Sequence, residues 1–94
     1  MGMDLQPHHG GNGLHYNLAG WGAIRKLARE KCNTSLPYLN EGEEIPAEVC
    51  WKIGEAIEQN AEWYNKTFGG GGYGEGPAEE HAWFWKNSTG VSVW

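Results

Sequence analysis

Apolar residues recur along the chain at two spacings, and the change from one spacing to the other separates predicted strands from predicted helices. In the segment 13–18, Leu14, Tyr16 and Leu18 alternate with polar residues, which is typical of a strand with one buried face. Residues 1–5 (MGMDL) predict an earlier strand. The glycines and proline of the connecting QPHHGGNG disfavour regular structure, so the two strands are expected to form a hairpin.

After Gly20 the apolar spacing becomes helical. A first amphipathic helix is predicted over about residues 20–32, with an apolar stripe of Trp21, Ile24, Leu27, Ala28 and Cys32. The segment 33–45 predicts irregular structure because it is rich in turn residues. A second helix is expected to begin near Pro46, since proline suits a first helical turn. Its buried stripe is predicted to comprise Val49, Ile53, Ala56, Ile57, Ala61 and Tyr64.

The C-terminal third predicts one more helix and a final strand. Pro77 followed by Ala78, Glu79 and Glu80 indicates a helix start, and the helix is expected to run to about Asn87. Gly90 ends it, and the residues 91–94 favour a strand. The glycine-rich stretch 69–76 (GGGGYGEG) is expected to be a flexible loop within a single domain spanning 1–94. The predicted order is β-β-α-α-α-β: an α+β domain with about three helices on a small antiparallel or mixed sheet.

Tryptophan is unusually frequent, with six residues among 94. Each indole can remove about 150–250 Å² from water, worth at most about 4–6 kcal/mol, so a small core can be held together by a few large side chains. The alternative use of such rings is a platform for a ligand or partner, since interfaces and stacking sites are rich in aromatic residues. Both uses stay open at this level.

Charge and cysteine content exclude several function classes. Seven basic and twelve acidic residues give a net charge of −5, which disfavours binding to duplex nucleic acid. No apolar stretch has the length of a membrane span, and the N-terminus lacks the apolar run of an export signal, so no membrane association and a cytoplasmic location are expected. Cys32 and Cys50 match neither a redox pair nor a zinc half-site. Two buried thiols are expected, and a disulfide between them would require an oxidising compartment.

Candidate chemistry is sparse. His8, His9 and His15 come nearest to a metal site, but adjacent histidines point to opposite faces of an extended chain, so no metal and no cofactor are predicted. His81 follows two glutamates on the third predicted helix, where neighbouring positions do not face one another, and a solvated or rim histidine is expected there. The glycine-rich loop is followed by Pro77 and two glutamates rather than by phosphate-binding residues. No catalytic residue is therefore assigned.

Several sequence features together resemble a group of short uncharacterised bacterial and phage proteins. They are the opening Met-Gly-Met-Asp-Leu, the strand-to-helix segment 14–21, Asn40-Glu41-Gly42 before a proline-initiated helix, and the terminal Gly-x-x-x-Trp pattern. The resemblance implies an accessory protein without an established activity. The QPHHGGNG and GGGGYGEG stretches depart from the shared pattern, and a function particular to this chain is expected in such loops.

Two functional hypotheses follow from the aromatic residues. Trp51 lies off its helical stripe and is expected to pack within the monomer, with contact to another chain or a ligand as the alternatives. Trp83, Phe84 and Trp85 cannot all face one core, so Trp85 is expected to be buried and Trp83 to lie at the surface. The leading hypothesis is a non-enzymatic module that binds a protein partner or a second copy of itself, with Trp51, Tyr73 and Trp83 as contacts. The alternative is a small-ligand site, for a nucleotide or sugar, with stacking rings and anion contacts from Arg25, Lys26 or Arg29. An enzyme comes third.

Overall fold

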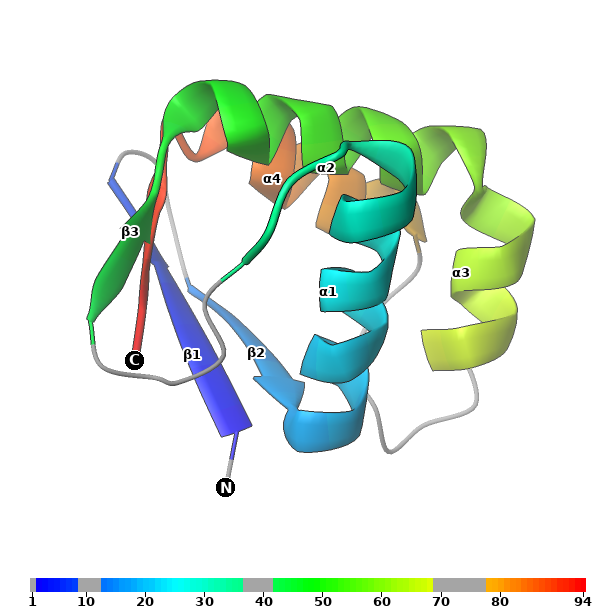
Figure 1. Cartoon of the computed structure of the whole chain (residues 1–94), viewed down its shortest axis with the longest axis horizontal. Coiled ribbons are helices and arrows are strands. Elements are labelled where there is room, and N and C mark those ends of the chain that lie inside the picture. The colour runs from blue at the N-terminus through cyan, green and yellow to red at the C-terminus, as the bar shows by residue number, and fades with distance from the viewer. Residues whose placement is uncertain (1, 9–12, 37–41, 69–77) are drawn as a thin grey trace.

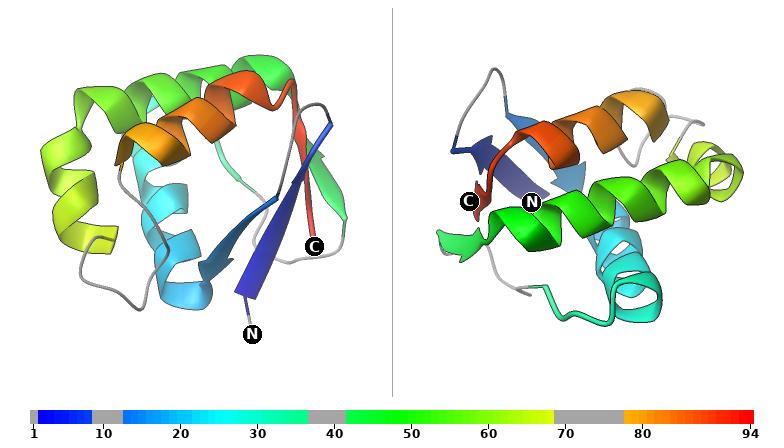
Figure 2. Two further views of the ribbon diagram at one scale, coloured as in Figure 1. Left: turned by 180° about the vertical axis from the view of Figure 1, so that it is seen from behind. Right: turned by 90° about the horizontal axis from the view of Figure 1, so that it is seen from above.

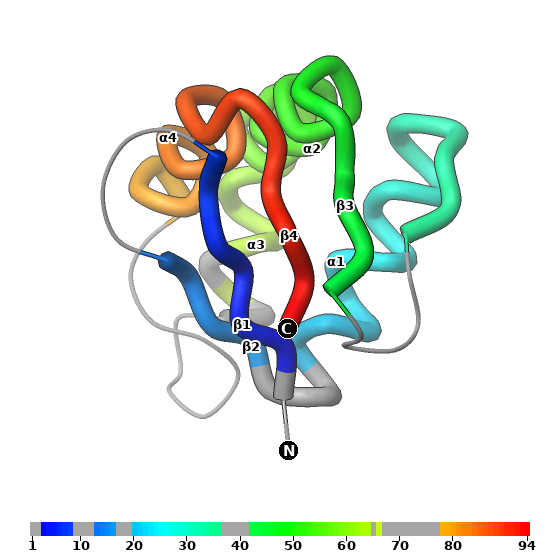
Figure 3. The backbone as a smooth tube through the Cα atoms, turned by 90° about the vertical axis from the view of Figure 1, so that its left-hand side faces the viewer, coloured from blue at the N-terminus to red at the C-terminus, as the bar shows by residue number. Residues whose placement is uncertain are grey.

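Four strands form one antiparallel sheet in which the first and last strands of the chain are neighbours at the centre (Figures 1 and 3). The computed structural model describes residues 2–8, 13–36, 42–68 and 78–94. The strands are β1 (Gly2–Pro7), β2 (Leu14–Asn17), β3 (Glu43–Ile45) and β4 (Val91–Val93), in the order β2-β1-β4-β3. The predicted hairpin is confirmed, with Met3 opposite Tyr16 and Asp4 opposite His15.

The helices lie on one side of this sheet (Figure 3). They are α1 (Leu18–Lys31), α2 (Ala47–Gln59), α3 (Ala61–Phe68) and α4 (Ala78–Asn87). The view from above in Figure 2 places α2 between α1 and α4. Among the helices of the described residues, none is both long and apolar enough to cross a bilayer. The predicted α+β class, with helices on a small antiparallel sheet, is confirmed.

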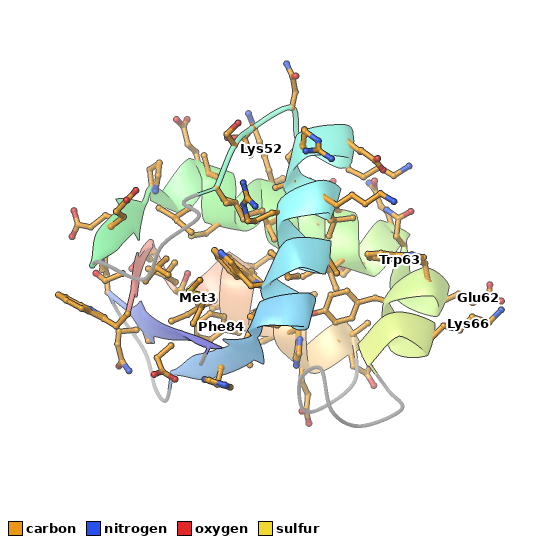
Figure 4. All side chains as sticks on the ribbon, turned by 60° about the horizontal axis from the view of Figure 1, so that its bottom comes forward. Met3, Lys52, Glu62, Trp63, Lys66 and Phe84 are labelled. Atoms are coloured by element: carbon orange, nitrogen blue, oxygen red, sulfur yellow. The ribbon has the colours of Figure 1, made fainter. Side chains whose placement is uncertain are left out.

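The core lies between the sheet and the helices because side chains alternate across each strand. The side chains that face the helices are buried, and they are Met3, Leu5, Tyr16, Ile45, Val91 and Val93. The opposite face carries exposed polar side chains, including Asp4, Gln6, His15 and Glu44. Figure 4 shows Met3 and Phe84 inside the layer that separates the sheet from the helices.

Strand β3 lies within the segment that was predicted to be irregular. It has only three residues, two of them glutamates, and only Ile45 is buried. Its partner is β4, with Ile45 opposite Val91 and Glu44 opposite Ser92. Such a short polar segment has no periodic signal of its own, and pairing with a strand far along the chain decides its conformation.

The predicted second helix is divided into α2 and α3 at Asn60. The backbone of Asn60 leaves helical geometry at φ −120° and ψ 32°. Its side-chain amide donates to the carbonyl oxygen of Ala56 at 2.8 Å, which satisfies a helix-terminal carbonyl. The expected stripe nevertheless stays on the core side, because Ile53, Ile57 and Tyr64 are all buried.

The other two helices agree closely with the predictions. Helix α1 begins two residues earlier than expected, and its stripe of Trp21, Ile24, Leu27 and Ala28 is buried. Cys32 follows the helix and is partly buried, while Cys50 on α2 is fully buried, and both are free thiols. Helix α4 spans the range expected for the last helix. The predicted loop 69–76 lies outside the described residues.

Candidate functional site

The six tryptophans divide into a buried and an exposed set. Trp21 and Trp85 are among the largest fully buried side chains. Trp51, Trp63, Trp83 and Trp94 expose between 40% and 62% of their surface. The exposed indoles belong to α2, α3, α4 and the residue after β4.

Helix α4 separates its three consecutive aromatic residues by simple rotation. At about 100° per residue, Trp83 and Trp85 point in nearly opposite directions. Trp85 is fully buried and Phe84 is buried beside it, with their rings edge to face at a centroid distance of 6.0 Å. Trp83 is 62% exposed, the largest value among the tryptophans. The predicted burial of Trp85 and exposure of Trp83 are therefore confirmed.

Helices α2 and α4 approach closely because a glycine lies at their crossing. A Cβ atom on Gly54 would come within 2.8 Å of the carbonyl oxygen of Ala82 and 2.7 Å of Cγ of Lys86. A larger residue at this position would force the helices apart. The close approach places the side chain of Lys86, from α4, against the surface of α2.

Lys86 links the two helices at the surface. Its Nζ lies 5.3 Å from the ring centroid of Trp51 and forms an ion pair with Oε1 of Glu58. Trp51 is thus partly covered by its own chain, while about half of it stays exposed. Trp83 precedes Lys86 by three residues and lies on the same side of α4. We call the exposed side chains of Trp51, Glu58 and Trp83, together with the partly buried Lys86, the α2–α4 surface.

A depression lies beside Trp83 at the start of α4. Its described lining is Glu79, Glu80 and Trp83, and its volume is about 360 Å³. It is shallow and open to solvent. Both glutamates are exposed and occupy the first turn of the helix, where acidic side chains are also favoured by the helix dipole. The described lining of the depression therefore comes from one aromatic and two acidic residues.

The remaining residues named from the sequence lie elsewhere. Arg25 and Arg29 belong to α1, which lies on the opposite side of α2 from α4 (Figure 2). Tyr73 lies outside the described residues. Trp63 is carried by α3 at the end of the molecule away from the sheet (Figure 4). Trp94 packs against Gly42, where a Cβ atom would come within 2.5 Å of its ring.

A buried hydrogen-bonded cluster was missed by the sequence reasoning. The hydroxyl oxygens of Tyr16 and Tyr64 lie 2.6 Å apart, and both contact Nδ1 of His81. Nε1 of Trp85 donates to the Tyr16 oxygen at 3.3 Å. The expectation of a solvated or rim His81 is wrong, because this side chain is 1% exposed. His81 shares the apolar stripe of Ala78, Ala82 and Trp85, and that spacing was the available signal.

One direction of hydrogen bonding uses the indole N–H and the two phenol O–H groups once each. Trp85 can only donate, so Tyr16 accepts from it, Tyr16 donates to Tyr64, and Tyr64 donates to Nδ1 of His81. Desolvation raises the pKa of Tyr16 more than its hydrogen bonds with Tyr64 and Trp85 lower it. Desolvation also raises the pKa of Tyr64, as do the charge and hydrogen bond of Tyr16. Both phenols therefore stay protonated, and the cluster serves to join β2, α3 and α4.

Two histidines lie at the sheet and form no catalytic relay. His15 contacts Asp4, with 2.7 Å between Nδ1 and Oδ1. His8 uses the same atom, Nε2, toward Oγ of Ser92 at 3.3 Å and Oε1 of Glu44 at 3.4 Å. A relay from a carboxylate through histidine to a serine requires both ring nitrogens, so this arrangement does not activate Ser92.

Neither a metal-binding group in the described residues nor a related protein gives a further indication of function. Within the described part of the chain, no three His, Cys, Asp or Glu side chains are grouped so as to hold a metal ion. His9 lies outside that part. No protein-family model, curated protein or solved structure matches the chain.

Proposed function

We propose that the chain is a non-enzymatic interaction module that binds a protein partner through the α2–α4 surface. The observation that carries the proposal is the exposure of Trp83, which leaves most of an indole in water on a helix whose next two residues are buried. Association would remove this apolar area from solvent. Tryptophan is also the residue type most often found among the energetically dominant contacts of interfaces.

The contacts of Trp51 also support the α2–α4 surface as the binding surface. Lys86 stacks over the Trp51 ring and is itself held by Glu58, so three side chains from two helices constrain one another. Constrained side chains lose less conformational entropy when a partner binds. The surface then offers one fixed and one protruding indole on adjacent helices.

A nucleotide ligand is less compatible with this geometry than a protein. The carboxylates of Glu79 and Glu80 beside Trp83 would repel phosphate groups. The arginines that could bind phosphate belong to α1, across α2 from α4. Tyr16 and Tyr64, the groups with strongly raised pKa values, are fully buried and cannot contact a substrate. A sugar stacked on Trp83 is the alternative to a protein partner.

The test begins with a photo-crosslinking amino acid in place of Asn87, which is exposed and lies one helical turn from Trp83. The captured protein is identified, and its dissociation constant with the purified chain is measured by calorimetry. The variants Trp83→Ala and Trp51→Ala are compared with Trp63→Ala and Trp94→Ala as matched controls. A second copy of the chain would count as the partner.

We expect Trp83→Ala to weaken the complex about 30-fold or more, which corresponds to about 2 kcal/mol. Trp51→Ala should weaken it less, because Lys86 already covers part of that ring. The controls should change the dissociation constant less than about threefold. Equal effects of all four variants, or a dominant effect of Trp63 or Trp94, would refute the assignment of the α2–α4 surface. Binding of sugars with no protein partner would refute the proposal itself.

A further inference from the structure

The depression at the start of α4 has a composition suited to one class of side chain. An indole ring attracts cations through its negative face, and two adjacent carboxylates attract them directly. Glu79, Glu80 and Trp83 bring both effects to one open depression. A lysine or arginine offers the matching features, an apolar stem for the ring and a positive head for the carboxylates.

The charges around the depression also favour a basic side chain. Lys86 is the basic residue in the last turn of α4, and its ammonium is already paired with Glu58. Glu79 and Glu80 are exposed, and the chain as a whole carries a formal charge of −5. A basic partner is therefore attracted at long range and at the depression itself.

We propose that the depression formed by Glu79, Glu80 and Trp83 receives a lysine or arginine side chain from a basic segment of the partner protein. The inference rests on the proposed function, because it names the chemistry of the partner for the same surface. A second copy of the chain is a weaker occupant, since two copies at −5 each repel one another. An arginine would gain most, because its planar head can stack on the indole while it bonds to carboxylates.

The probe is an N-acetylated, C-amidated pentapeptide of sequence Gly-Lys-Gly-Arg-Gly. Its control peptide carries norleucine in place of lysine and citrulline in place of arginine, which removes the charges and keeps the length. Binding is followed by the Nε1–H resonance of Trp83 in ¹⁵N-labelled protein. That resonance is assigned by its loss in Trp83→Phe.

Two double variants separate local recognition from overall charge. Glu79→Gln with Glu80→Gln alters the depression, whereas Glu30→Gln with Glu62→Gln alters exposed glutamates on α1 and α3. Each double variant changes the formal charge from −5 to −3 by removing two negative charges. Differences between them therefore report position and not net charge.

We expect the basic peptide to shift the Trp83 resonance and the neutral peptide to leave it unchanged. The Glu79/Glu80 variant should weaken peptide binding at least tenfold, and the Glu30/Glu62 variant less than threefold. Equal weakening by both variants, equal binding of both peptides, or an unperturbed Trp83 resonance would overturn the inference.

The failures of the two proposals are distinguishable. If Trp83→Ala weakens the natural complex but the basic peptide does not perturb Trp83, this inference fails and the proposed function stands. If the peptide binds at Trp83 as expected but Trp83→Ala leaves the natural complex intact, the proposed function fails. Self-association that persists in the Glu79/Glu80 variant would assign the surface to a second copy and contradict the basic partner.

Discussion

The hydroxyl oxygens of Tyr16 and Tyr64 lie 2.6 Å apart in the core, although the residues are 48 positions apart in the sequence. Tyr16 belongs to β2 and Tyr64 to α3, and His81 of α4 contacts both hydroxyls. The cluster thereby ties the short helix α3 to the sheet and to α4. Buried polar groups stabilise a fold only when they are hydrogen-bonded, so each member depends on the others.

Replacing Tyr64 by phenylalanine should lower the free energy of unfolding by about 1–3 kcal/mol. The substitution keeps the ring but deletes the hydroxyl that contacts both Tyr16 and His81. Urea unfolding measures the change. The double variant Tyr16→Phe/Tyr64→Phe should cost less than the sum of the single changes, because the two hydroxyls share a hydrogen bond. Strict additivity would show that they do not interact.

Alkaline pH should destabilise the protein through the same two residues. The pKa values of Tyr16 and Tyr64 are raised in the folded state above the ordinary value of 10.0. Above about pH 10 the unfolded chain releases protons that the folded chain retains, so their stabilisation is complete below that pH and is lost as pH rises. Each tyrosine should then lower the free energy of unfolding by about 1.4 kcal/mol per pH unit.

Urea unfolding at several values between about pH 8 and pH 11 tests this prediction, since the effect begins near the ordinary phenol pKa. Lysine side chains also titrate in this range, so the slope of the wild type is compared with that of Tyr16→Phe/Tyr64→Phe. The double variant should have the shallower slope. Identical slopes would mean that these phenols ionise as easily in the folded protein as in the unfolded chain.

Two glycines in helices should respond oppositely to substitution by alanine. Gly54→Ala should destabilise by about 1–3 kcal/mol, because its Cβ would collide with the backbone of Ala82 and with Lys86. Gly22 in α1 has nothing within 4 Å of a Cβ position, so Gly22→Ala should stabilise by about 0.5–1 kcal/mol. Thermal unfolding of both variants decides the matter. Stabilisation by Gly54→Ala would contradict the tight crossing of α2 and α4.

The two tryptophans of α4 should differ strongly in their contribution to stability. Trp85→Ala removes a fully buried indole and should cost about 3–5 kcal/mol, which is most of the stability of a small domain. Trp83→Ala should change the free energy of unfolding by no more than about 0.5 kcal/mol, since the side chain is mostly in water. Chemical denaturation of each variant gives the comparison. A large loss with Trp83→Ala would show that this ring belongs to the fold and would weaken its assignment to an interface.

The division between Trp83 and Trp85 could be predicted from the sequence because it depends only on helical geometry. Side chains two positions apart on a helix point in nearly opposite directions. Trp85 shares the apolar stripe of Ala78 and Ala82, so Trp85 is the buried one of the two tryptophans. Strand β2 was predictable from its alternation of apolar and polar residues, and the range of α4 from its proline start and glycine end. The depression beside Trp83 was not predictable, because it arises from the shape of the folded surface.

The sequence by itself therefore determined the elements whose apolar spacing is regular, and with them the α+β class and the exposure of Trp83. The tertiary structure alone decided the pairing of β3 with β4, the contact of Lys86 with Trp51, and the cluster of Tyr16, Tyr64 and His81. These features join residues that are distant in the chain. Their energies come from pairing and desolvation that exist only once the elements are packed, so no local pattern specifies them.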